Sequence, residues 1–84
     1  GYEAVLCQYI EVKETLIPVF NPNLAAALQS LTELQRLVLL EHVCLDVSLK
    51  DISRELNISE RMVRKHKHNA IESIRRRMQK DEEV

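Results

Sequence analysis

Basic side chains gather in the C-terminal half of this 84-residue chain, at spacings that let several of them face one partner. Residues 50–80 carry ten basic and four acidic side chains, a net charge of +6. Residues 1–46 carry two basic and six acidic side chains, a net charge of −4. Because phosphate binding depends on a local basic face, the overall charge of −1 does not exclude a nucleic-acid partner.

The basic residues with the most informative spacing lie at the start of a helix expected to run to about Gln79. If Val63 faces inward, helical periodicity also buries Ala70 and Ile74 and leaves the opposite face polar. The N-terminal turns of such a helix enter the DNA major groove when a short helix and a tight turn precede it. The residues expected to contact DNA there are Ser59, Glu60, Arg61, Arg64, Lys65 and His68.

Two further basic residues lie away from that point of insertion, and any contact they make is expected to be to phosphate. Lys50 belongs to the preceding short helix. Arg75 opens the run Arg75 to Arg77 near the C-terminal end, where positive charge also complements the helix dipole. The interaction with phosphate and the interaction with the dipole both remain open for Arg75.

Capping signals predict where the helices begin. They are Asn21 followed by Pro22, the capping box of Thr32 and Gln35, Ser48 followed by Asp51, and Ser59. The predicted helices end near residues 31, 45, 56 and 79, and residues 57–59 form the tight turn. Residues 3–17 contain no helix breaker before Pro18, and apolar residues recur on one face, so a further N-terminal helix is expected there.

These elements predict an all-α fold, a small helical bundle that contains a helix-turn-helix. Hydrophobic residues make up 45% of the chain and charged residues 30%, the balance of a folded domain rather than a disordered tail. The expected organisation is an N-terminal helix and linker over 1–20, the helix-turn-helix domain over 21–80 and an acidic tail over 81–84. One core is expected to contain Leu37, Leu40, Ile52, Leu56, Val63, Ala70 and Ile74.

Three stretches of this sequence resemble region 4 of sigma-70 family factors. Residues 31–40 are similar to its opening stretch, and residues 48–59 to the first helix and turn of its helix-turn-helix. Val63 and Arg64, with residues 69–75, resemble its recognition helix and the continuation of that helix. The resemblance covers about residues 24–78. It departs from the family at Cys44 to Val47, where the usual glycine is absent, and at Lys50, where an acidic residue is more common.

The resemblance implies recognition of the −35 promoter element and a second contact with the β flap of the RNA polymerase core. The apolar and acidic segment 24–47 is where the flap contact is expected, because a helix docks in an apolar surface. An anti-sigma or co-regulator protein is a further expected class of partner. Two alternatives stay open: a LuxR-type regulator, and a degenerate helix-turn-helix that binds only proteins.

Other classes of function find no support in the sequence. No glycine-rich phosphate loop and no catalytic spacing is present, so the protein is not expected to be an enzyme or to hold a cofactor. His66 and His68 would point to different faces of a helix, so no metal site is expected. Cys7 and Cys44 are expected to be buried, reduced thiols, which favours the cytoplasm. No apolar run is long enough to span a membrane, and the missing initiator methionine suggests a fragment of a longer protein.

Overall fold

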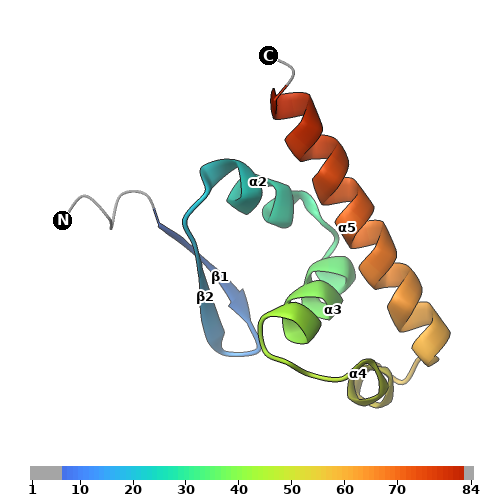
Figure 1. The fold of residues 1–84 in the computed structure, drawn as a ribbon. Coiled ribbons are helices and arrows are strands. Elements are labelled where there is room, and N and C mark those ends of the chain that lie inside the picture. The colour runs from blue at the N-terminus through green and yellow to red at the C-terminus, as the bar shows by residue number, and fades with distance from the viewer. Residues whose placement is uncertain (1–6, 83–84) are drawn as a thin grey trace.

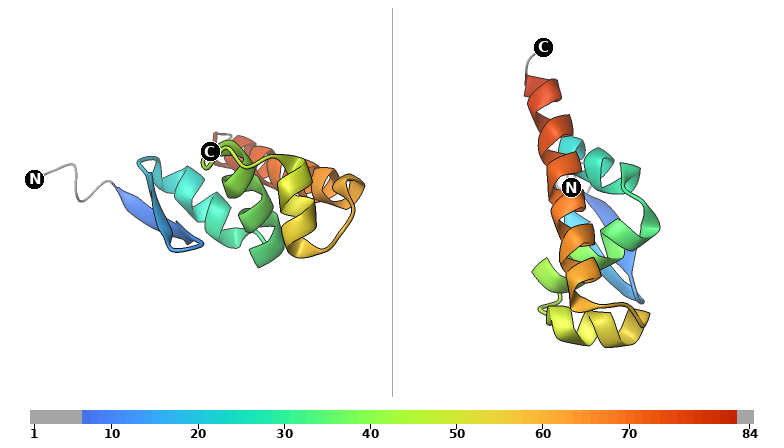
Figure 2. Two further views of the ribbon diagram at one scale, coloured as in Figure 1. Left: turned by 90° about the horizontal axis from the view of Figure 1, so that it is seen from below. Right: turned by 90° about the vertical axis from the view of Figure 1, so that its right-hand side faces the viewer.

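The structure is a computed structural model that describes residues 7–82. Its elements are β1 Gln8–Val12, β2 Thr15–Val19, α2 Pro22–Ser30, α3 Glu33–Val43, α4 Leu49–Leu56 and α5 Glu60–Glu82. The two strands form a hairpin at one side of the molecule, α5 runs along the opposite side, α2 and α3 lie between them, and α4 lies beside the start of α5 (Figures 1 and 2). None of the described helices has the length and apolar character needed to cross a bilayer.

The side chains predicted to cap the helices do so. Asn21 Oδ1 accepts hydrogen bonds from the amides of Asn23 and Leu24, at 2.9 and 3.2 Å, and Pro22 follows at the first helical position. Thr32 and Gln35 exchange both hydrogen bonds of the capping box. The four helices therefore begin where the sequence predicts, because these side chains satisfy amide groups that a helix leaves unpaired at its start.

The prediction of an N-terminal helix over 3–17 is wrong for residues 8–17; residues 3–6 lie outside the described part of the chain. The segment forms an antiparallel hairpin in which Ile10 pairs with Ile17 and Val12 with Thr15. Its two turn residues, Lys13 and Glu14, adopt left-handed backbone angles, with φ of 48° and 66°. The fold is thus mostly helical with a two-stranded sheet, rather than all-α.

Burial of apolar side chains explains why this segment forms two strands rather than a helix. Ile10, Val12 and Val19 are each less than 10% exposed and pack against α2 and α3. Alternate residues of a strand share one face, so the hairpin delivers all three to the core together. Pro18 is tolerated because a two-stranded sheet consists of edge strands alone.

The apolar interior divides into two clusters, where the sequence predicts one. Leu40 and Ala70 belong to the larger cluster, which the hairpin, α2, α3 and α5 share and against which Leu37 and Ile74 pack. Val38, Ile52 and Val63 form the smaller cluster, between α3, α4 and α5, with Leu56 packed against it. The division arises because α4 lies across one end of α5, while α2 and the hairpin lie further along the molecule (Figure 2).

The cysteines are also placed differently from the prediction. Cys44 is exposed at the end of α3, and Cys7 is partly exposed just before β1. Both are free thiols.

The first testable prediction concerns the crossing of α5 with α2 and α3. Ala70 is fully buried, so Ala70→Leu should overpack the contact and lower the free energy of unfolding by about 1–3 kcal/mol. Denaturant titration measures the change. The matched control is Asn69→Leu, which adds the same side chain at an exposed neighbour and should change stability by less than about 0.5 kcal/mol. Equal stability of the two variants would contradict the packing.

The second prediction concerns the turn of the hairpin. Glycine adopts positive φ without steric cost, so Glu14→Gly should raise the free energy of unfolding by up to about 1 kcal/mol. Glu11→Gly, an exposed position in the extended part of β1, should lower it by about 0.5–1 kcal/mol. Thermal unfolding of both variants checks that their free energies of unfolding change in opposite directions. A loss of stability in Glu14→Gly would show that the turn is not left-handed.

Candidate nucleic-acid interface

The turn between α4 and α5 brings the two helices into a helix-turn-helix. Asn57 ends α4 in the left-handed conformation, with φ of 57°. The amide of Ile58 then donates to the carbonyl of Ser53 at 3.0 Å, and the amide of Asn57 to that of Arg54 at 3.3 Å. This is the hydrogen-bond pattern of a Schellman motif, which closes a helix and turns the chain sharply. Ile58 packs into the same cluster as Ile52 and Val63, so the turn is held by apolar contact as well.

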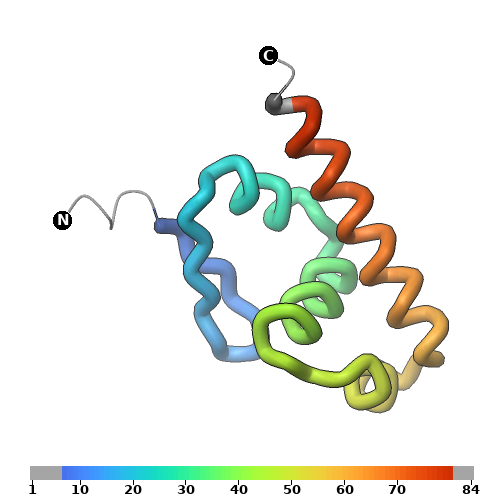
Figure 3. The backbone as a smooth tube through the Cα atoms, viewed as in Figure 1, coloured from blue at the N-terminus to red at the C-terminus, as the bar shows by residue number. Residues whose placement is uncertain are grey.

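The loop that leads into α4 contains no glycine among its residues Cys44 to Val47. Asp46 takes the left-handed conformation instead, with φ of 57°, and aspartate tolerates this region better than most residues. Val47 closes the loop, because its amide donates to the carbonyl of Glu41 at 3.0 Å and its carbonyl lies 2.9 Å from His42 Nδ1. The trace of the backbone shows this bend and the tight turn into α5 (Figure 3).

Five of the eight residues predicted to contact DNA lie together at the start of α5. A shallow hollow at the start of the helix is lined by Ser59, Arg61, Met62, Arg64, Lys65 and His68. All six residues are exposed. Ser59 also caps the helix, since its hydroxyl accepts from the amide of Met62 at 3.1 Å. Met62 is the one member of the hollow that sequence reasoning did not select.

The other predicted contact residues lie outside this hollow. Lys50 is exposed in the first turn of α4, and Glu60 is exposed beside the hollow, without an ion pair among the described residues. Arg75 lies further along α5, where its guanidinium donates to Glu72 at 3.1 Å. That pair is at the surface, so solvent screening leaves Arg75 available to exchange this partner for a phosphate.

A second surface feature is an apolar groove between the end of β2, α2, α3 and α5. Its lining contains no charged side chain and consists of Ile17, Pro18, Val19, Phe20, Leu24, Leu28, Leu39, Leu40, Val43, Cys44 and Ile74. Phe20 and Val43 are 64% and 63% exposed. Sequence reasoning selected segment 24–47 for an apolar contact, which covers the part from α2 and α3, but it missed β2, Phe20 and Ile74.

A family model for sigma-70, region 4 matches residues 22–74, well over half of the chain. The chain belongs to the sigma-70 region 4 family. The match is to the family whose motifs the sequence resembles, and it runs from the start of α2 into the second half of α5. Membership assigns to this region 4 domain a general role in transcription, with DNA and RNA polymerase as the kinds of partner. Comparisons with curated proteins and with solved structures gave no significant match.

The hairpin precedes the part of the chain that matches region 4, and it contributes a contact that sequence reasoning missed. Lys13, predicted on a helix face, forms ion pairs with Glu41 of α3 and Glu55 of α4. The alternation of Ile10 with Val12 was a signal for the strand, but the missing glycine or asparagine at the turn concealed it. The partners of Lys13 carried no signal, since they are far from it in the sequence.

Proposed function

We propose that this region 4 domain recognises the −35 element of a promoter as a cytoplasmic, non-enzymatic part of a sigma factor. The observation that carries the proposal is the exposed hollow at the start of α5, where Arg61, Arg64 and Lys65 lie together. Helix-turn-helix proteins insert the N-terminal turns of the second helix into the major groove and lay the first helix across the backbone. Arginine and lysine there pair with guanine O6 and N7.

Base recognition and phosphate contact are divided between different residues in this proposal. Arg64 projects from the second turn of α5 into the hollow and is suited to a base edge. Lys50 stands on α4, the helix that would cross the DNA backbone, and is suited to a phosphate. Glu60 carries no ion pair among the described residues, which leaves its carboxylate free to accept from cytosine N4.

The third prediction separates these two tasks. Arg64→Ala should relax preference at one base pair, with a loss of discrimination of about 1–3 kcal/mol. Lys50→Ala should weaken binding to all sequences alike and reduce the salt slope by about one. Binding to a panel of single-base promoter variants at several salt concentrations makes the measurement.

Arg76→Ala is the control for loss of positive charge on α5 outside the hollow. A uniform loss of affinity for Arg64→Ala, with the base profile of the wild type, would assign Arg64 to phosphate. Absence of DNA binding by the wild-type protein would leave the alternative of a module that binds only proteins.

We propose in addition that the apolar groove receives a helix of the RNA polymerase β flap. Helix-in-groove recognition requires an apolar channel that accepts the apolar face of an amphipathic helix. The groove supports this, because its lining is uncharged and two of its large side chains, Phe20 and Val43, are mostly exposed. It also lies away from the hollow on α5, so DNA and the flap would contact different residues.

The fourth prediction tests the groove. Val43→Asn and Phe20→Ser should each weaken binding to the isolated β flap at least about tenfold, since replacing an apolar anchor of an interface by a polar side chain costs about 2 kcal/mol or more. DNA binding should not change. Leu16→Ser is the matched control, because Leu16 is 59% exposed on the hairpin but does not line the groove. An equal effect of all three substitutions, or a parallel loss of DNA binding, would contradict this site.

A further inference from the structure

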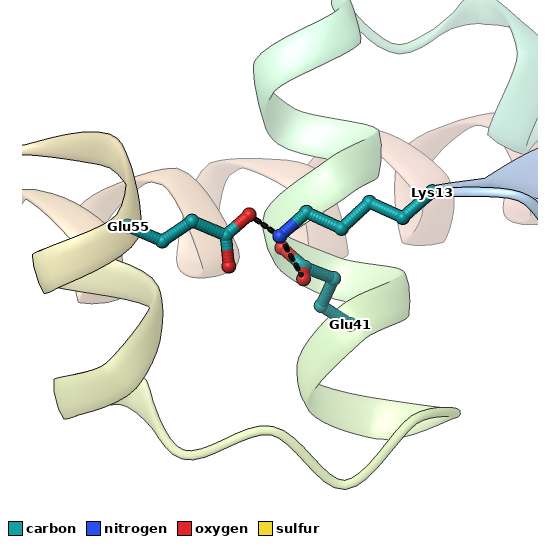
Figure 4. Close-up of polar contacts among 3 residues, drawn as sticks. All are labelled: Lys13, Glu41 and Glu55. Carbon is teal, nitrogen blue, oxygen red and sulfur yellow. Dashed lines mark ion pairs between the residues drawn. The ribbon is translucent and has the colours of Figure 1, made fainter.

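Lys13, in the turn of the hairpin, reaches carboxylates on two helices that are far from it in the sequence (Figure 4). Its Nζ lies 3.1 Å from Glu41 Oε1 on α3 and forms a second ion pair with Glu55 on α4. The ammonium group stands between the two carboxylates, so one side chain joins three elements (Figure 4). We call Lys13, Glu41 and Glu55 the lysine bridge.

The bridge is anchored on the buried side by Glu41. The side chain of Glu41 is 2% exposed, and Lys13 is its ion-pair partner among the described residues. Its second oxygen, Oε2, is buried without a hydrogen-bond partner in the described part of the chain. Burial of a carboxylate is costly unless a cation compensates it, so Glu41 holds the ammonium group of Lys13 close to α3.

The backbone of the turn is consistent with a lysine held in place. Lys13 adopts φ of 48°, a conformation that is uncommon for residues with a Cβ atom. Such conformations persist where the surrounding structure compensates for them. Here the compensation includes the two ion pairs and the burial of Val12, the residue before the turn.

On the exposed side the bridge reaches the helix-turn-helix. Glu55 belongs to the last turn of α4, and its side chain is 34% exposed. Helix α4 has eight residues, and a helix of that length depends on contacts outside itself for its stability and placement. Its apolar contacts are to α3 and α5, and the ion pair with Lys13 adds a link to the hairpin.

We propose that Lys13 is a positioning residue for DNA recognition: through Glu55 it holds α4, and with it the helix-turn-helix, in the arrangement that binds DNA. The hairpin then acts as a functional part of the DNA-binding unit, although it precedes the region that matches the family. This inference rests on the proposed binding of DNA, and Lys13 itself need not touch the DNA.

Substitution of Glu55 gives a test in which the positioning role and simple electrostatics predict opposite changes in DNA affinity. Loss of a negative charge from α4 should strengthen DNA binding if charge alone matters. If the bridge positions α4, Glu55→Gln should instead weaken binding about threefold to tenfold, the size of a typical coupling between neighbouring residues. The control for charge is Asp51→Asn, the same charge change at an exposed position of α4 without an ion pair among the described residues. Asp51 lies in the first turn of α4, where its charge complements the helix dipole, so any loosening of α4 in this control works against the expected difference.

A second pair of variants separates positioning from stability. Lys13→Met leaves Glu41 buried without its cation, so Tm should fall by more than about 10 °C. The double variant Lys13→Met with Glu41→Met removes both charges and leaves the net charge unchanged, and Tm should return to within about 5 °C of the wild type. DNA binding of the double variant should stay about threefold to tenfold weaker, because the link to Glu55 is still absent. Lys13→Arg, which keeps the cation, should retain most of the affinity.

The probe is a DNA duplex selected from a random-sequence pool with the wild-type protein, and amide hydrogen exchange of α4 is measured in parallel. The expected result is faster exchange in α4 for Glu55→Gln than for Asp51→Asn, together with weaker DNA binding. Wild-type affinity in the double variant, or unchanged exchange of α4 in Glu55→Gln, would overturn the positioning role. If the selection yields no duplex that the wild type binds, the proposed DNA binding fails, and hydrogen exchange still decides whether the bridge holds α4.

Discussion

Close packing along one face of α5 is the constraint on which the rest of the structure depends. Val63 and Ala70 are both fully buried, and they stand seven residues apart, about two helical turns. Val63 packs against α3 and α4 in the smaller cluster, while Ala70 lies in the larger cluster with α2, α3 and the hairpin. Because side-chain directions around a helix are fixed relative to one another, burial of this face leaves Arg61 and Arg64 exposed to solvent. The same helical phase therefore determines which residues of α5 pack in the core and which are exposed for the proposed contact with DNA.

The connections between elements meet a second constraint, since the only glycine of the chain is Gly1. The described residues with positive φ are Lys13, Glu14, Asp46 and Asn57. Each non-glycine residue in that region needs compensation from its surroundings. For Asn57 it comes from the Schellman hydrogen bonds and the packing of Ile58, and for Asp46 from the bonds that close its loop. For Lys13 it comes from two carboxylates.

The hairpin extends the region 4 fold in two ways. Its inner face closes the larger cluster, and the end of β2 forms one wall of the apolar groove. Its turn supplies the ammonium group that compensates Glu41 and reaches α4. A segment outside the family match thus borders the groove proposed for the polymerase and is linked to the helix proposed to cross DNA.

The sequence by itself determined the helix starts and the helical phase of α5, because these depend on residues within about two helical turns of each other. It also indicated the family, through motifs spread over about residues 24–78. Ser59 and Asn57 carry the turn chemistry in their own side chains, and the repeat of Val63 with Ala70 is visible along the chain. Only the tertiary structure decided that residues 8–19 form a hairpin, because the local pattern of apolar residues fits both a helix and a strand, and burial of Ile10 and Val12 against α2 and α3 selects the strand. For the same reason the bridge from Lys13 to Glu55 could not be predicted: an ion pair between residues so far apart in the chain exists only after packing has placed both elements.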